Sequence, residues 1–195
     1  MDDRAHDLAV VLDILEDVGT DHALIGGLAV GYHGYERATI DVDMLVPGRS
    51  LKRVADAARD RGYVVRTFLP DMIRIYPAGT AEENKSIADL VSAESNPVLR
   101  AAFREVEPVD LLGEQVNVVT FGTLIALKFH AAVSPARAIE DKYQDVADIG
   151  HLVKARFTQD DNATGHRIAS LAYPGAGEDF DSFINDLRHG RLVRI

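Results

Sequence analysis

The stretch IGGLAVGYHGYERATIDVDMLV, residues 25–46, decides which kind of fold this chain can form. It sets two adjacent glycines ahead of an apolar run that contains two aspartates, Asp41 and Asp43. Side chains two residues apart on a strand point to the same face, so both carboxylates would project together while Val42 and Met44 fill the other face. Two like charges that close repel each other unless a cation or an arginine neutralises them. A divalent metal ion is the most economical explanation.

The glycines and the residues before the aspartates fit the same interpretation. Gly26 and Gly27 would let backbone N–H groups approach a triphosphate at a helix N-terminus, where larger side chains would obstruct it. Arg37 and Thr39 would donate hydrogen bonds to phosphate oxygens. Taken singly, a Gly-Gly pair is usually a turn, and an Asp-x-Asp pattern usually lies at a solvated edge or loop. Their combination in one strand-turn-strand unit favours metal-dependent phosphoryl or nucleotidyl transfer.

Length, charge and composition limit the other possibilities. A chain of 195 residues forms one large domain, or a core domain with a smaller one appended. It has 31 acidic and 21 basic residues, and a formal charge of −10 disfavours broad adhesion to nucleic acid or to an anionic membrane. The absence of cysteine excludes disulfides and thiolate metal sites, so Mg²⁺ or Mn²⁺ on carboxylates is the default metal. The N-terminal sequence MDDRAHDLAV resembles neither a signal peptide nor a transmembrane span, and we expect a cytoplasmic protein without membrane contact.

The periodicity of apolar residues predicts an α/β (α+β) fold with a mixed sheet. Residues 8–18 and 50–61 have helical spacing, and residues 28–35 could form a helical turn or a short helix. We expect roughly five strands, a short helix and a hairpin that turns at Gly113-Glu114. The strand-like runs are 22–27, 39–47, 63–69, 72–79 and 86–93, the short helix is 96–103 and the hairpin is 109–120.

The character of the sequence changes after Thr120. Helical periodicity dominates from there, which predicts a small bundle made of residues 121–133, 140–157 and 179–190. The segment 173–179, YPGAGED, is predicted to be a flexible linker. We therefore expect a core domain at residues 1–120 and a helical C-terminal region at residues 121–195 that completes the site.

Several of these segments together resemble a known family. The Gly-Gly pair followed by Arg-x-Thr-x-Asp-x-Asp resembles the signature of the nucleotidyltransferase superfamily that includes DNA polymerase beta, in the minimal form of the AbiE-type (abortive-infection) proteins. The segment SIADLVSA, residues 86–93, resembles the strand that carries the family's third carboxylate. The helical sequences FGTLIALKFHAA and KYQDVADIGHLV resemble the family's helical segment. The resemblance covers roughly residues 20–155.

This resemblance implies a role for each matching residue. Asp41, Asp43 and Asp89 would bind the metal and act in catalysis, and Gly26 and Gly27 would form the triphosphate-binding turn. In the helical segment, the resemblance implies that Lys128 contacts the nucleotide or its phosphates and that Asp145 is the downstream acid that shapes the site. Many members of the superfamily have Gly-Ser where this chain has Gly-Gly, so one hydroxyl donor is missing here.

The residues themselves leave simpler alternatives open. Asp89 could pair with Arg74 on a neighbouring strand instead of binding a metal, because a carboxylate in an apolar strand needs a partner. Lys128 could extend its ammonium to solvent from an amphipathic helix. Asp145 and Asp148 share one helix face and could belong to a solvated ladder of salt bridges.

The resemblance implies a Mg²⁺-dependent or Mn²⁺-dependent enzyme that moves an NMP from an NTP to an acceptor hydroxyl. The acceptor could be RNA or tRNA, a protein or a small molecule, and the protein could be a toxin with a cognate antitoxin or another partner protein. A catalytically inactive nucleotide-binding fold that acts as an antitoxin or a sensor is the alternative. A purely structural α/β domain is the least favoured. An RNA acceptor would favour a basic groove, for which the candidates are Lys128, Arg137, Lys142, Lys154 and Arg156.

Overall fold

The computed structural model describes residues 3–39, 41–79, 86–191 and 193. The chain divides into two compact units. The first consists of Met1–Ala29 and Arg37–Val119, and the second of Val30–Glu36 and Thr120–Ile195. Within the described ranges, no helix combines the length and the apolar character that crossing a membrane requires.

The first unit is built on one mixed sheet with the strand order β3-β4-β5-β2-β1-β7-β6. The pairs β2–β5 and β1–β7 are parallel, and the other neighbours are antiparallel. The described part of the sheet has seven strands rather than roughly five, because the predicted hairpin joins the same sheet through the pairing of β7 with β1. The strands are β1 (Ala23–Leu24), β2 (Val42–Val46), β3 (Val64–Leu69), β4 (Met72–Tyr76), β5 (Ala88–Ser92), β6 (Val106–Leu111) and β7 (Glu114–Val119).

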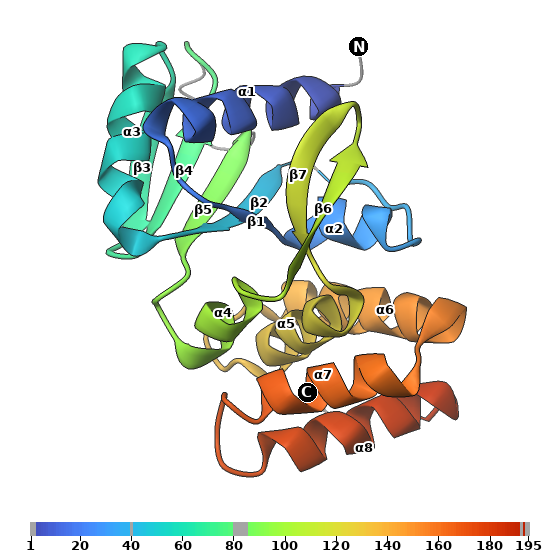
Figure 1. The fold of residues 1–195 in the computed structure, drawn as a ribbon. Coiled ribbons are helices and arrows are strands. Elements are labelled where there is room, and N and C mark those ends of the chain that lie inside the picture. Colours follow the sequence, from blue (N-terminus) through green and yellow to red (C-terminus); the bar gives the residue numbers. More distant parts are fainter. Residues whose placement is uncertain (1–2, 40, 80–85, 192, 194–195) are drawn as a thin grey trace. The chain divides into compact units, whose positions relative to one another are not determined.

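Helices pack on this sheet where the apolar periodicity predicted them. Helix α1 (Asp3–Val18) contacts β2 and β7, and helix α3 (Leu51–Asp60), after a 3₁₀ turn at Gly48–Ser50, contacts β3, β4 and β5. The two helices also contact each other and so cover the same side of the sheet (Figure 1). Helix α4 (Pro97–Ala102) is capped by Asn96, whose side chain accepts a hydrogen bond from the N–H of Leu99.

The hairpin turns one residue earlier than predicted. Leu112 and Gly113 are the two loop residues, and both have positive φ, of 58° and 90°. A two-residue loop with positive φ at both positions matches the right-handed twist of the flanking strands. This twist requirement explains why Leu112 lies in a region that glycine usually occupies.

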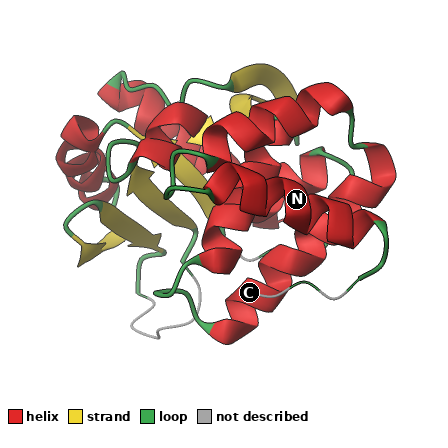
Figure 2. Ribbon diagram, turned by 90° about the horizontal axis from the view of Figure 1, so that it is seen from below, coloured by secondary structure: helices red, strands yellow, loops and turns green. Residues whose placement is uncertain are grey.

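The second unit is made of helices joined by loops (Figure 2). Helices α5 (Phe121–Val133) and α6 (Ile139–Arg156) were predicted within one residue of their bounds, and α8 (Ala176–Arg188) within three at its start. Helix α7 (Gln159–Ala169) was not predicted, because its sequence QDDNATGHRIA has few apolar residues. Its signal was a capping box, in which Thr158 and Asp161 exchange side-chain to backbone hydrogen bonds.

The prediction of a flexible linker at 173–179 is wrong. Helix α8 begins inside that segment at Ala176, directly after Gly175, whose φ is 89°. Ala176 and Gly177 are buried, and a Cβ at Gly177 would overlap the side chains of Ser170 and His166. The glycines therefore make a tight turn between two packed helices.

Candidate active site

Asp41 and Asp43 lie at the start of strand β2. The strand begins at Val42, so Asp43 lies within it and Asp41 directly precedes it, which corrects the prediction that both belong to the strand. Asp43 is level with Asp89 of the parallel neighbour β5. Carboxylate oxygens of Asp41, Asp43 and Asp89 all lie within 4.8 Å of one another. The structure thus brings together the three predicted acids, which we call the acidic triad.

The acidic triad is electrostatically crowded. Burial raises the pKa of Asp41 above its ordinary value, and the nearby charge of Asp89 raises it further. The positive charges of Arg74 and Arg37 act in the opposite direction, as does a backbone hydrogen bond. The charged form of Asp41 is therefore disfavoured in the metal-free protein, and a bound cation would relieve this cost.

Asp89 is both a member of the triad and the partner of an arginine. Its side chain is almost fully buried, and Arg74 on strand β4 stands directly opposite it in the antiparallel register. The Nε of Arg74 donates to Oδ1 of Asp89 at 2.6 Å, and one of its terminal nitrogens donates to Oδ2. These hydrogen bonds from the guanidinium raise the pKa of Arg74 above its usual range. The alternative pairing with Arg74 is confirmed, and it coexists with the position of Asp89 in the triad.

The two glycines make room for polar side chains. Gly26 begins helix α2 (Gly26–Tyr32) with a φ of 66°, and a Cβ at this position would overlap the carboxylate of Asp43. A Cβ at Gly27 would overlap the hydroxyl of Thr39. The N–H of Ile25 donates to the carbonyl of Asp43 at 2.9 Å and fixes this close approach. Both glycines are therefore required by the packing of Asp43 and Thr39 against the helix start.

We expect Gly26→Ala to destabilise the protein and weaken metal binding, because alanine at positive φ costs about 1–2 kcal/mol and its Cβ would displace Asp43. The matched control is Gly31→Ala in the same helix, where an added Cβ meets nothing within 4 Å. That control is expected to be neutral or stabilising by up to about 1 kcal/mol. Thermal unfolding with and without Mn²⁺ measures both effects. Equal behaviour of the two variants would contradict this explanation of Gly26.

The pKa of Asp41 predicts a pH dependence of stability. Because the folded-state pKa of this carboxyl is raised, the metal-free folded state binds more protons than the unfolded state as pH falls toward that pKa. The group therefore destabilises the fold at neutral pH, and this destabilisation is relieved as pH falls through the raised pKa. Comparing the melting temperature of metal-free wild type and Asp41→Asn across this range isolates the contribution. A difference that does not vary with pH would refute the assignment.

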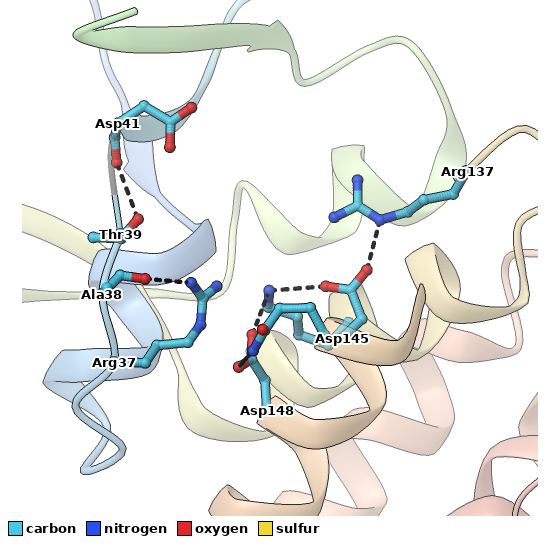
Figure 3. Close-up of polar contacts among 9 residues, drawn as sticks. Arg37, Ala38, Thr39, Asp41, Arg137, Asp145 and Asp148 are labelled. Atoms are coloured by element: carbon cyan, nitrogen blue, oxygen red, sulfur yellow. Dashed lines mark hydrogen bonds and ion pairs between the residues drawn. The ribbon is translucent and has the colours of Figure 1, made fainter. Parts of the chain in front are cut away.

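Arg37 and Thr39 flank the triad along the chain. Arg37 donates from Nη1 to the carbonyl of Ala38 at 2.9 Å, and the hydroxyl of Thr39 makes a long hydrogen bond of 3.5 Å to the backbone oxygen of Asp41 (Figure 3). Both side chains are partly exposed. The hydrogen bond of Thr39 is at the upper limit of length, so this hydroxyl is held weakly, whereas the hydrogen bond of Arg37 has ordinary length.

The helical unit holds a separate group of buried charges around Lys128, which we call the Lys128 network. The Nζ of Lys128 lies 2.9 Å from a carboxylate oxygen of Asp145 and 2.8 Å from one of Asp148. Arg137 binds Asp145 at 2.6 Å (Figure 3). Gln144 donates to Asp148 at 2.8 Å. The exposed fractions of Lys128, Asp145 and Asp148 are 7%, 1% and 0%. The alternatives of a lysine extended to solvent and of a solvated ladder are therefore both wrong.

Three of the five basic residues that were candidates for an RNA groove make contacts within the second unit. Lys128 and Arg137 both pair with Asp145. Arg156 lies 3.1 Å from the ring nitrogen of His33 and stacks over the ring of Phe121 at 4.4 Å. These contacts reduce the charge available for an RNA groove. Sequence reasoning missed Arg137 as a partner, since it lies in the loop before α6 and matches no helical spacing.

Comparison with known proteins identifies the fold. No protein-family model matches the chain, and no curated protein matches it. Among solved structures, the antibiotic-resistance factor ANT(2'')-Ia is 14% identical with a TM-score of 0.59, over 97% of this chain and 98% of its own. An antigenic nucleotidyltransferase-like protein from Paracoccidioides brasiliensis is 14% identical with a TM-score of 0.56, over 94% of this chain and 93% of its own. The lincosamide antibiotic adenylyltransferase LnuA, with lincomycin bound, is 13% identical with a TM-score of 0.50, over 75% of this chain and 96% of its own.

These likenesses, together with the mixed sheet and the helical unit, confirm the predicted α/β nucleotidyltransferase fold.

Proposed function

We propose that this protein is a metal-dependent nucleotidyltransferase that moves an NMP from an NTP to an acceptor hydroxyl. The observation that carries the proposal is the acidic triad, in which Asp41, Asp43 and Asp89 bring carboxylate oxygens within 4.8 Å of one another. A fold without turnover has little physical reason to keep three carboxylates so close, because their mutual repulsion destabilises it. This argues against the alternative of an inactive antitoxin or sensor.

The donor set of the triad fits Mg²⁺ or Mn²⁺. All three side chains offer carboxylate oxygens, the ligands that hard divalent cations prefer, and the chain has no cysteine that would select a softer metal. Asp41, Asp43 and Asp89 would hold the ion. When bound, it would supply Lewis-acid stabilisation of the charge that develops on phosphate oxygens.

The residues around the start of helix α2 would bind the triphosphate. The first N–H groups of a helix have no carbonyl partner within it and can donate to phosphate oxygens. Gly26 and Gly27 let this helix start lie directly against Asp43 and Thr39, next to the proposed metal ligands. Arg37 and Thr39 would exchange their intramolecular hydrogen bonds for phosphate oxygens. The chain thus orients the NTP with its own donors while the carboxylates carry the cation.

The roles of Lys128 and Asp145 remain predictions from the family resemblance. An ammonium has three N–H donors, and Lys128 uses two directions for Asp145 and Asp148. The third N–H is the one with which Lys128 would contact a phosphate, as the family resemblance implies. Asp145 would then shape the site by holding Lys128 and Arg137 in place.

For the acceptor, we propose a small molecule with a free hydroxyl. ANT(2'')-Ia, which matches this chain over nearly its whole length, has also been solved in complex with adenylyl-2''-tobramycin, and LnuA with lincomycin. A formal charge of −10 also attracts cationic small molecules and repels RNA. RNA, tRNA or protein as acceptor, and a role as a toxin with a cognate antitoxin, are the alternatives that the AbiE-type resemblance leaves open.

The test is transfer of label from each of the four α-³²P-labelled NTPs in the presence of Mg²⁺. The acceptor pools are a panel of aminoglycosides and lincosamides, total RNA and total protein, and the control is the double variant Asp41→Asn, Asp43→Asn. Label that appears in one pool with wild type only would establish the reaction and the acceptor class. NTP binding by wild type without transfer to any pool would favour the inactive sensor or antitoxin instead.

A further inference from the structure

Arg74 is placed where it can control the geometry of the acidic triad. The register pairs Arg66 with Arg74 across β3 and β4, Arg74 with Asp89 across β4 and β5, and Asp89 with Asp43 across β5 and β2. Directly paired strand residues point to the same face. One row of side chains on a single sheet face therefore links the β3–β4 hairpin to the proposed metal ligands.

The contact between Arg74 and Asp89 fixes the orientation of a carboxylate. The guanidinium reaches both oxygens of Asp89, with one hydrogen bond of 2.6 Å to Oδ1 and a second to Oδ2. A pair with two parallel hydrogen bonds defines the plane of the carboxylate, which a single bond would not do. A carboxylate has about four lone-pair positions, so two remain for a cation on the side of Asp41 and Asp43.

Arg74 is in turn held by an aromatic ring. Its guanidinium carbon lies 4.5 Å from the centre of the Phe68 ring, and Phe68 is 53% exposed on the edge strand β3. An arginine stacked on a ring loses rotational freedom about its side-chain bonds. The Phe68 ring therefore restricts the pose of the guanidinium that binds Asp89.

We propose that Arg74 is a positioning residue that orients Asp89 within the acidic triad, and that Phe68 holds Arg74 in that pose. This inference rests on the proposed function, because Asp89 needs a fixed orientation only if it binds a metal ion. The two parallel N–H donors of the Arg74 guanidinium, and not its charge alone, set the orientation of the Asp89 carboxylate. The β3–β4 hairpin thereby contributes to the site without touching the metal.

The test is Mn²⁺ binding, measured by electron paramagnetic resonance, together with the kcat and KM for NTP. We expect Arg74→Met to weaken Mn²⁺ binding by about tenfold to a hundredfold, as removal of groups that orient metal ligands does, and to lower kcat with KM within about threefold. Arg74→Lys keeps the charge but cannot make two parallel bonds, so we expect no rescue. Phe68→Leu, at an exposed position, should weaken Mn²⁺ binding by about threefold while the protein stays folded.

Arg66→Met is the matched control, since Arg66 lies one strand further along the same row and stacks on Tyr76. It should leave Mn²⁺ binding unchanged. Full recovery in Arg74→Lys would show that charge suffices and would overturn the inference, as would unchanged Mn²⁺ binding in both Arg74→Met and Phe68→Leu. Failure of wild type to bind Mn²⁺ would instead contradict the proposed function, and would remove the site that Arg74 is proposed to position.

Discussion

Asp43→Asn is expected to reduce nucleotidyl transfer by about a thousandfold, which corresponds to about 4 kcal/mol of transition-state stabilisation. Asn has nearly the same shape as Asp but lacks the negative charge, so the variant removes one charged ligand from the acidic triad without leaving a cavity. Asp43 is paired with Asp89 in the register of β2 and β5, and carboxylate oxygens of Asp41, Asp43 and Asp89 all lie within 4.8 Å of one another. The stability of the metal-free protein should stay the same or rise, since one source of repulsion is gone.

The matched control for Asp43→Asn is Asp110→Asn, an exposed aspartate on strand β6 of the same sheet. This control should keep both activity and stability. The measurement is steady-state transfer of label from α-³²P NTP, with circular dichroism to verify folding. An Asp43→Asn enzyme that keeps more than about a tenth of wild-type activity would show that the chemistry does not depend on this carboxylate.

Lys128→Met is expected to destabilise the protein by about 3–5 kcal/mol, the usual effect of removing one partner from a buried ion pair. Lys128 lies between the buried carboxylates of Asp145 and Asp148. Arg137 also binds Asp145, and Gln144 also donates to Asp148. Denaturant unfolding measures the change. If Lys128 acted only on the nucleotide, the variant would bind NTP more weakly and unfold at the same denaturant concentration as wild type.

Lys154→Met is the control for Lys128→Met, because Lys154 is exposed on helix α6. Its effect should stay within about 0.5 kcal/mol. A second variant, Lys128→Met combined with Asp148→Asn, should recover part of the lost stability, because it removes one of the two carboxylates left without their lysine. Absence of any recovery would show that the destabilisation comes from lost packing instead of unpaired charge.

Much of the acidic triad was predictable because strand geometry is periodic. The alternation of apolar and acidic residues in 39–47 predicted that Asp41 and Asp43 would project together, and the family resemblance predicted Asp89 as the third acid. Helix α5 was predicted at its observed bounds from the helical periodicity of its own residues, and most of them are buried. These features follow from patterns within one segment.

The remaining features depend on contacts between segments that no local pattern contains. The pairing of Arg74 with Asp89 was considered but could not be decided, because it requires the register of β4 against β5. The burial of the Lys128 network was missed because a polar stripe on α6 looks the same whether solvent or a buried lysine faces it. The need for Gly26 was assigned to phosphate approach, while its packing against Asp43 appears only when the strand is placed beside the helix start.

The most direct test of the central claim is anomalous X-ray diffraction from crystals grown with Mn²⁺ and a non-hydrolysable α,β-methylene NTP analogue. The proposed function predicts an anomalous peak coordinated by carboxylate oxygens of Asp41, Asp43 and Asp89, with the triphosphate of the analogue at the start of helix α2. Asp43→Asn crystals under the same conditions should lose that peak. A triphosphate bound elsewhere, with no anomalous signal among the three carboxylates, would contradict the assignment of the acidic triad as a metal centre for nucleotidyl transfer.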